Sequence, residues 1–158
     1  MSVTSALQWI ENTDLSMAVR EGALPYPILG GIHLLGIALF GGMLLVSDLR
    51  LLGLAMQKRP VFDVIQQFRT GKQIGFWMVA ISGLLLAWAE PLKLYRSPAF
   101  WVKMALLALV GLHALIFRSR VYQNAEPDPA ARAKWAAALS LILWAGLIFS
   151  GRLIAFDE

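Results

Sequence analysis

Four long apolar runs dominate the pattern of hydrophobic and polar positions along the chain. Each run has between 16 and 20 residues with at most one charged side chain, and charged residues or prolines bound it on both sides. An α-helix needs about 20 apolar residues to cross the hydrocarbon core of a bilayer. The pattern therefore predicts four membrane-spanning helices, at about 27–50, 73–90, 98–118 and 133–154.

The segments between these runs are short. Residues 60–72 form an amphipathic connector, and the loop at 124–129 contains two prolines. Short connections favour antiparallel neighbours. We therefore expect an all-α fold, an integral membrane four-helix up-and-down bundle in which residues 1–158 form a single membrane domain. The apolar side of the connector is expected to consist of Val61, Phe62, Ile65 and Phe68.

The N-terminal segment, residues 1–26, alternates apolar and charged residues without a long apolar run. It predicts two short helices, with Asp14 as the N-cap of the second and Gly22 at its end. Such an amphipathic segment typically lies at the membrane surface, with Trp9 at the level of the headgroups. Because no basic residue precedes Arg20, we expect no cleavable signal peptide.

The positive charges are distributed unequally between the two ends of the predicted bundle. Nine lie in the loops after the first and third spans, and five lie at the opposite end. Because cytoplasmic loops carry an excess of Lys and Arg, both termini are predicted on the non-cytoplasmic side. The nine are Arg50, Lys58, Arg59, Arg69, Lys72, Arg118, Arg120, Arg132 and Lys134; the five are Arg20, Lys93, Arg96, Lys103 and Arg152.

Composition narrows the class of protein further. Of 158 residues, 58% are apolar and 15% charged, whereas a soluble domain usually has about 25% charged residues. The absence of cysteine excludes disulfides, thiolate metal sites and c-type haem attachment. The net charge is +4, but the basic residues form no continuous patch because long apolar runs separate them. We therefore expect a lipid bilayer as partner and no nucleic acid.

Both histidines of the chain, His33 and His113, fall inside predicted spans. Ionisable groups at membrane depth are costly and point to function. Two imidazoles on neighbouring helices are the axial ligands that a b-type haem uses, so His33 and His113 are candidate ligands of a haem iron. Arg120, two turns beyond His113 on its helix, is a candidate contact for a haem propionate.

The surroundings of His33 support this hypothesis, and depth argues against pairing the two histidines. Gly30, Gly36 and Gly41 lie within about 80° of His33 on a helical wheel, a face with room for a flat macrocycle. If Tyr26 and Trp101 mark one interface, His33 is 7 residues deep and His113 is 12, about 7 to 8 Å apart in depth. The alternative ligand at the depth of His33 is Met104, and His113 is then a separate or structural residue.

Charged and sulfur-containing residues offer further alternatives. The pairs Asp48 with Arg50 and Glu90 with Arg152 could bind a quinone head or an anionic propionate, or act as interface anchors and ion pairs between helices. Met43, Met78 and Met104 are compatible with a copper pathway or with simple packing.

Three stretches carry a resemblance to known families. The chain resembles uncharacterised small four-helix proteins of the bacterial inner membrane, which implies the same location here. More distantly, His33 with its glycine-rich face and Arg50 resembles CopD-like copper-resistance proteins and HemJ-type protoporphyrinogen oxidases. The third span, with Lys103 and then His113, is similar to the third helix of the HemJ type. The stretches are PILGGIHLLGIALFGGMLLVSDLRLLG, PAFWVKMALLALVGLHALIF and LSLILWAGLIFSGRLIAF.

This resemblance implies a haem or porphyrin site that uses His33, Lys103 and His113. The sequence thus predicts a membrane redox protein that binds haem b and exchanges electrons with a quinone or a partner complex. Lys103, Arg120 and Arg152 are its candidate anion contacts. The alternatives are a non-catalytic accessory subunit of a larger membrane complex and a HemJ-like porphyrinogen oxidase. A second copy of the chain, in a homo-oligomer, is a further candidate partner.

Overall fold

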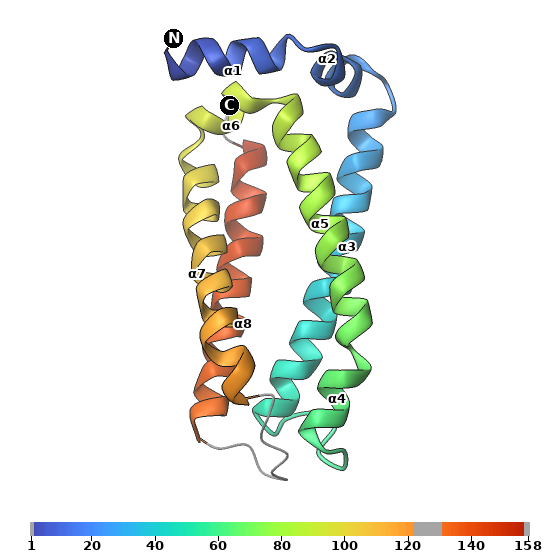
Figure 1. Ribbon diagram of the computed structural model, residues 1–158, viewed down its shortest axis with the longest axis vertical. Coiled ribbons are helices and arrows are strands. Elements are labelled where there is room, and N and C mark those ends of the chain that lie inside the picture. Colours follow the sequence, from blue (N-terminus) through green and yellow to red (C-terminus); the bar gives the residue numbers. More distant parts are fainter. Residues whose placement is uncertain (1, 122–130, 157–158) are drawn as a thin grey trace.

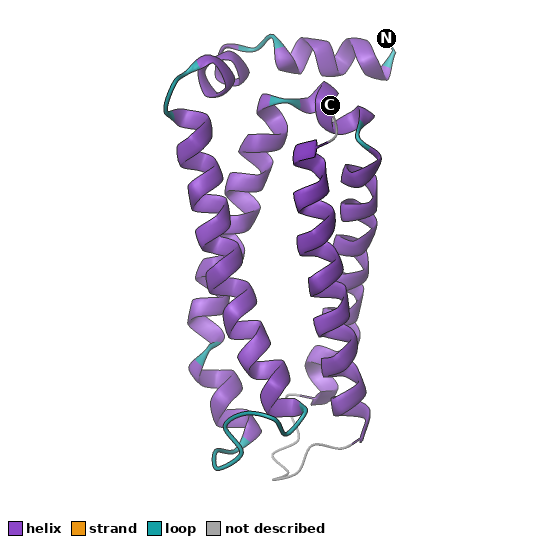
Figure 2. Cartoon of the chain, turned by 180° about the vertical axis from the view of Figure 1, so that it is seen from behind, coloured by secondary structure: helices purple, strands orange, loops and turns teal. Residues whose placement is uncertain are grey.

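The computed structural model describes residues 2–121 and 131–156, and every regular element within them is a helix (Figures 1 and 2). Four helices are long and apolar enough to cross a membrane: α3 (Pro25–Leu51), α5 (Arg69–Ala89), α7 (Pro98–Val121) and α8 (Ala131–Leu153). They run alternately up and down, which confirms the predicted all-α membrane bundle. The predicted loop at 124–129 lies outside the described residues.

The bundle has two ends that differ in their contents. The two ends of the chain lie together at one of them, here called the terminal end, and the connector from α3 to α5 lies at the other, the loop end (Figure 1). The four long helices form two pairs, α3 with α5 and α7 with α8, and α3 also packs against α8. The two pairs stand apart at the terminal end and come together toward the loop end (Figures 1 and 2). The membrane-spanning part of the fold is therefore a pair of antiparallel hairpins joined along one seam.

Small residues allow the first pair to approach closely. A Cβ atom at Gly36 of α3 would lie 2.9 Å from Cβ of Met78, and one at Gly83 of α5 would lie 3.0 Å from Cε1 of His33. Membrane helices commonly use glycine in this way, because it lets two backbones pack at short range. His33 therefore faces α5.

A small apolar core closes the loop end. Leu51, Val61, Ala133 and Ala137 are buried against one another there. The connector contains α4 (Val61–Gln67), which buries Val61 and Val64. Phe62, predicted on the apolar side, is instead 45% exposed, because the helical turn of α4 directs Val64 inward in its place.

Two short helices, α1 (Val3–Glu11) and α2 (Asp14–Glu21), lie across the terminal end of the bundle (Figure 1). The N-cap of α2 is Thr13, whose side chain accepts from the Ser16 backbone N–H, so the prediction of Asp14 as the cap is wrong by one residue. Asp14 occupies the first turn instead, where its negative charge suits the positive end of the helix. Gly22 follows the helix as predicted.

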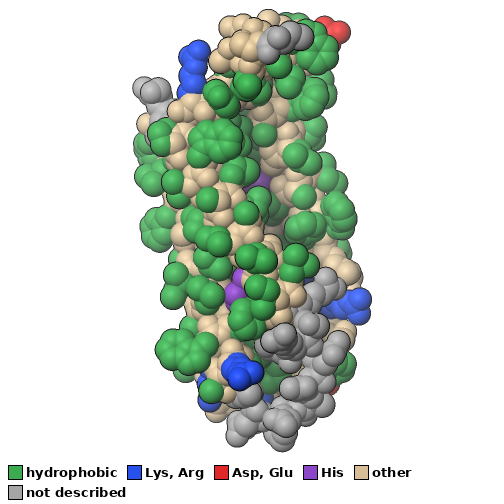
Figure 3. All heavy atoms as spheres, turned by 60° about the vertical axis from the view of Figure 1, so that its left-hand side comes forward, with side chains coloured by type: hydrophobic (Ala, Val, Ile, Leu, Met, Phe, Trp, Pro, Cys, Tyr) green, Lys and Arg blue, Asp and Glu red, His purple; other side chains and the backbone are tan. Residues whose placement is uncertain are grey.

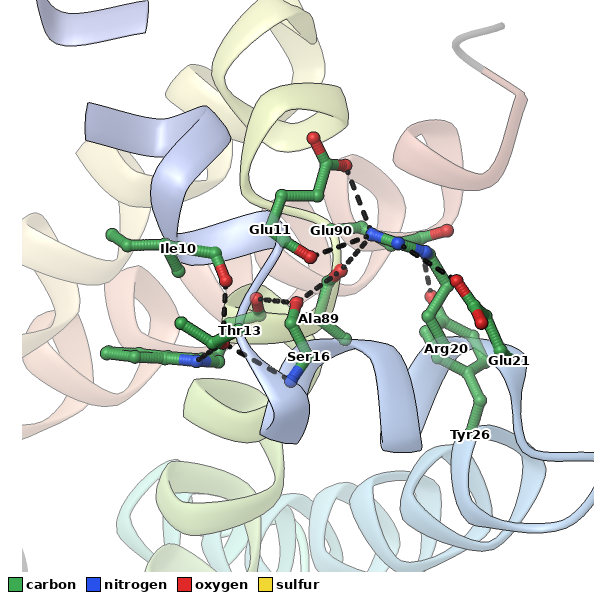
Figure 4. Close-up of polar contacts among 10 residues, drawn as sticks. Ile10, Glu11, Thr13, Ser16, Arg20, Glu21, Tyr26, Ala89 and Glu90 are labelled. Carbon is green, nitrogen blue, oxygen red and sulfur yellow. Dashed lines mark hydrogen bonds and ion pairs between the residues drawn. The ribbon is translucent and has the colours of Figure 1, made fainter. Parts of the chain in front are cut away.

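The side chains of α2 satisfy the last carbonyl groups of α5 (Figure 4). Ser16 Oγ lies 2.9 Å from the carbonyl oxygen of Trp88 and 3.1 Å from that of Ala89, and the Arg20 guanidinium also donates to Ala89. A helix leaves its last four carbonyls without partners in the helix itself. The N-terminal segment is therefore the C-cap of the second span, a role that its amphipathic pattern did not reveal.

A further helix, α6 (Pro91–Arg96), links α5 to α7 and was not predicted. Beside it, the Tyr26 hydroxyl donates to the Glu90 carboxylate over 2.9 Å (Figure 4). This bond joins the start of α3 to the end of α5.

Apolar side chains cover most of the face seen in Figure 3, and the Lys and Arg side chains visible there lie toward the two ends. Trp77, Leu84 and Leu115 are among the large apolar residues that are more than half exposed. An apolar belt between two polar ends is the surface that a bilayer requires. The described surface therefore fits a protein embedded in lipid.

Candidate functional site

His33 is held by a serine of the neighbouring helix. Nδ1 of His33 lies 3.0 Å from Oγ of Ser82 on α5, and Ser82 is only 3% exposed. The Ser82 hydroxyl donates its single hydrogen to the carbonyl of Met78. It can therefore only accept from His33, which means that Nδ1 carries a proton and that, in the neutral ring, Nε2 has the free lone pair.

The orientation of the ring agrees with this assignment. The Cε1 and Nδ1 atoms of His33 face Gly83, at 3.0 and 3.5 Å from the place of a Cβ atom, and Nε2 is not within 4 Å of that place. The backbone of Val79 is a further hydrogen-bond partner of the ring. The imidazole thus turns its protonated edge toward α5 and leaves Nε2 for another partner. A metal-bound histidine is commonly oriented in this way.

The ammonium charge of Lys103 on α7 acts electrostatically on the His33 imidazole. Its Nζ atom lies 3.6 Å from the place that a Cβ atom would take at Gly151 of α8. Both salt bridges among the described residues are made by Arg20, so no described carboxylate pairs with Lys103. His33 and Lys103 together present an imidazole lone pair and an uncompensated ammonium group from two different helices.

His113 is not part of this arrangement. Its Nε2 atom lies 3.0 Å from the carbonyl oxygen of Ala136 on α8, and its ring lies 4.8 Å from that of Phe117. Ten residues, or about 15 Å of helix, separate it from Lys103. Histidine side chains appear at two separate heights in Figure 3. The structure therefore places Lys103 where its charge acts on His33, and it leaves His113 in the α7–α8 interface.

The remaining predicted site residues are dispersed. Arg152 lies near the C-terminal end of α8, with its guanidinium carbon 5.4 Å from the ring centroid of Phe156, and it does not pair with Glu90 among the described residues. Met104 directly follows Lys103 on α7. The side chain of Arg120 lies outside the described residues.

Some of the predicted glycine and methionine positions are packed against a neighbouring helix, and others border open space. Gly36 is filled by α5, and nothing lies within 4 Å of a Cβ atom placed at Gly30 or Gly41. Met43 packs over Gly71, and Met78 packs over Gly36. These two methionines therefore contribute to contacts between α3 and α5.

A second polar group, here called the loop-end polar cluster, was only partly predicted from the sequence. It consists of Ser47, Asp48, Lys72, Ser140 and Trp144. The Ser140 hydroxyl hydrogen-bonds to the Asp48 carboxyl group, and Lys72 Nζ donates to Ser47 Oγ over 3.2 Å. Arg50, the predicted partner of Asp48, instead donates through Nε to the Arg59 carbonyl over 2.9 Å.

Comparison with family models gives one match, which spans residues 6–157. The chain belongs to the family of unknown function DUF6644. No curated protein and no solved structure matches it. This membership in DUF6644 confirms the predicted relation to an uncharacterised family. The more distant resemblance to CopD-like and HemJ-type proteins stays a prediction.

Sequence reasoning missed Ser82, Gly83 and Gly151, which lie against the side chains of His33 and Lys103. Their only signal is that they are small residues within apolar runs, and such residues are common in any membrane helix. Which of them faces a histidine or a lysine depends on how the helices pair.

Proposed function

We propose that this membrane protein binds haem b through Nε2 of His33 and takes part in electron transfer. One observation carries the proposal: His33, with its lone pair on Nε2 fixed by Ser82, lies within electrostatic range of the unpaired Lys103. A haem needs a neutral imidazole for its iron, and its propionates need positive charge. The two side chains offer both in the terminal half of the bundle.

The surrounding residues fit a tetrapyrrole in further respects. The Ser82 hydroxyl accepts from Nδ1 and so holds the His33 ring in one tautomer and orientation, as the hydrogen-bond partner of a metal-binding histidine does. Gly30 leaves open space on α3 near His33. Met104 follows Lys103 and would be the further protein ligand of the iron, whereas Nε2 of His113 already donates to Ala136. When bound, haem supplies one-electron oxidation and reduction, and the chain positions it and balances its charge.

The exchange partner in this proposal is a quinone or a larger membrane complex, because either delivers electrons within the bilayer. The excess of Lys and Arg at the loop end supports an orientation with that end in the cytoplasm and both termini outside. The bacterial inner membrane is the location that the resemblance implies.

An absorption spectrum of the full-length protein, purified from membranes, tests the proposal. We expect a Soret band, and α and β bands on reduction. The variant His33→Ala should lose these bands, and the matched control His113→Ala should keep them. A colourless, iron-free preparation that takes up no added haem would overturn the proposal and would favour an accessory subunit without a cofactor.

A second candidate function is porphyrinogen oxidation. The HemJ-type resemblance implies a porphyrin site that uses His33, Lys103 and His113, and the proximity of the first two supports it. Expression in a strain that lacks its own protoporphyrinogen oxidase separates the two candidates. Restored porphyrin synthesis, lost in Lys103→Met, would favour the oxidase. A haem spectrum without such rescue would favour electron transfer.

A further inference from the structure

Arg50, near the end of α3, is a buried arginine without a counter-ion among the described residues. The residue is 5% exposed, and its Nε atom donates to the Arg59 carbonyl over 2.9 Å. Both salt bridges of the described residues belong to Arg20. The carboxyl group of Asp48, two residues earlier on α3, bonds to Ser140 instead. The charge of Arg50 is therefore not paired with any described carboxylate.

Such an arginine needs a partner, because a buried charge is costly unless another group balances it. A guanidinium has several N–H donors in a rigid fork, and only the one on Nε has a described acceptor. The described side-chain polar atoms that are both fully enclosed and unpaired belong to Asp48 and Trp144. The terminal nitrogens of Arg50 are not among them, so they keep a small accessible surface at which an anion can reach them.

The apolar core of the loop end brings further positive charges to this region. Leu51, the residue after Arg50, shares that core with Ala133 of α8. Ala133 lies between Arg132 and Lys134 in the first turn of α8, and both of these side chains are exposed. The end of α3 and the start of α8 lie at the same end of the bundle (Figure 1). The charges of α8 therefore add to the positive potential near Arg50.

The start of α8 favours an anion for a second, independent reason. The N-terminal end of a helix carries a partial positive charge, which acidic residues in the first turn stabilise. The first turn of α8 contains no acidic residue and two basic ones, Arg132 and Lys134. This distribution of charge is unfavourable by itself, and a bound anion relieves it.

We propose that the Arg50 guanidinium binds a phosphate group at the loop end, within the positive potential of the start of α8. A phosphate suits the free donors, because its oxygens accept parallel hydrogen bonds from the fork of one guanidinium. The group can belong to an anionic phospholipid or to a soluble phosphate. Since α3 ends one residue after Arg50, the site lies at an end of the spans, where basic residues meet anionic headgroups. It does not depend on haem.

The test uses the full-length chain in a neutral detergent. Native mass spectrometry counts the lipids that stay bound after equal amounts of phosphatidylglycerol and of a phosphate-free galactosyl diacylglycerol are added. Thermal unfolding with inorganic phosphate, at constant ionic strength, measures the binding of a free phosphate. The variant Arg50→Gln removes the guanidinium, and Arg50→Lys keeps the charge without the fork. Arg69→Gln is the matched control, because Arg69 is exposed at the same end, at the start of α5.

Preferential retention of phosphatidylglycerol, about tenfold weaker in Arg50→Gln, also weakened in Arg50→Lys and unchanged in Arg69→Gln, supports a lipid phosphate. A saturable rise in melting temperature with inorganic phosphate, without a preference between the lipids, supports a free phosphate. An equal loss in Arg69→Gln would overturn the site, because the net charge of this end would then explain the binding. The absence of both signals in the wild-type chain overturns it as well, whether or not the variants fold.

Discussion

Phe40 and Gly75 are in direct contact: a Cβ atom at residue 75 would come within 2.7 Å of the Phe40 backbone nitrogen. Gly75 is buried where α5 packs against α3, and the neighbouring atom is backbone, which cannot move aside. The absence of a side chain at residue 75 therefore allows the short distance between α3 and α5. The same close packing places Ser82 against His33 further along the interface.

We expect Gly75→Ala to separate α3 from α5 and to lower the free energy of unfolding by about 1–3 kcal/mol. Thermal unfolding in detergent measures the change. Gly42→Ala is the control, because nothing lies within 4 Å of a Cβ atom at that position, and it should leave the stability within about 0.5 kcal/mol. Equal effects of the two substitutions would contradict the packing argument.

Ser82→Ala should weaken haem binding by about 10- to 100-fold, because it removes the partner that fixes the His33 ring. Haem titration of the folded apoprotein measures the affinity. Ser150→Ala is a matched control, since Ser150 is also buried but bonds only within α8. Unchanged affinity in Ser82→Ala would show that the His33 ring is held by other contacts.

Lys103→Met should have opposite effects on stability and on haem affinity. It removes an ammonium group that has no described counter-ion, so the haem-free protein should gain about 1 kcal/mol of stability. It also removes the charge proposed to meet a propionate, so haem should bind more weakly. Denaturation and haem titration of the same preparation give both values.

Lys93→Met is the control for this experiment, because Lys93 is exposed on α6 and should change neither quantity. Loss of stability in Lys103→Met would mean that the lysine has a stabilising partner that the described residues do not include.

Ser16→Ala should destabilise the end of α5, because the carbonyls of Trp88 and Ala89 lose their hydroxyl donor. The expected cost is about 1–3 kcal/mol, with faster amide hydrogen exchange in the last turn of α5. Ser5→Ala, on the exposed face of α1, should have no such effect. Exchange that stays slow in Ser16→Ala would show that the bond from Arg20 to the Ala89 carbonyl is enough to hold the end of α5.

Apolar runs and prolines were sufficient to predict the four long helices, because burial in lipid imposes length and composition directly on the sequence. They did not predict which helix faces which. In a membrane helix the lipid-facing and protein-facing sides are both apolar, so the usual amphipathic signal is absent. For this reason the sequence did not predict that Ser82 of α5 bonds to His33 or that Ser140 of α8 bonds to Asp48.

Residue depth was more informative than residue type. Counting from the start of each span indicated that His33 and His113 lie at different levels and that position 104 lies near the level of His33. In the structure the charge of the adjacent Lys103 acts on His33, and His113 bonds to Ala136. The N-terminal segment was harder, because its amphipathic pattern fits a membrane surface and a helix cap equally well.

Through the hydrogen bonds from α2 to the end of α5, the first 24 residues stabilise the C-terminal end of the second span. Trimming the chain to its four long helices would expose the carbonyls of Trp88 and Ala89 at the point where the second span leaves the membrane. Such a shortened chain would lack the cap of the second span. The residues that form this cap precede the first span in the sequence.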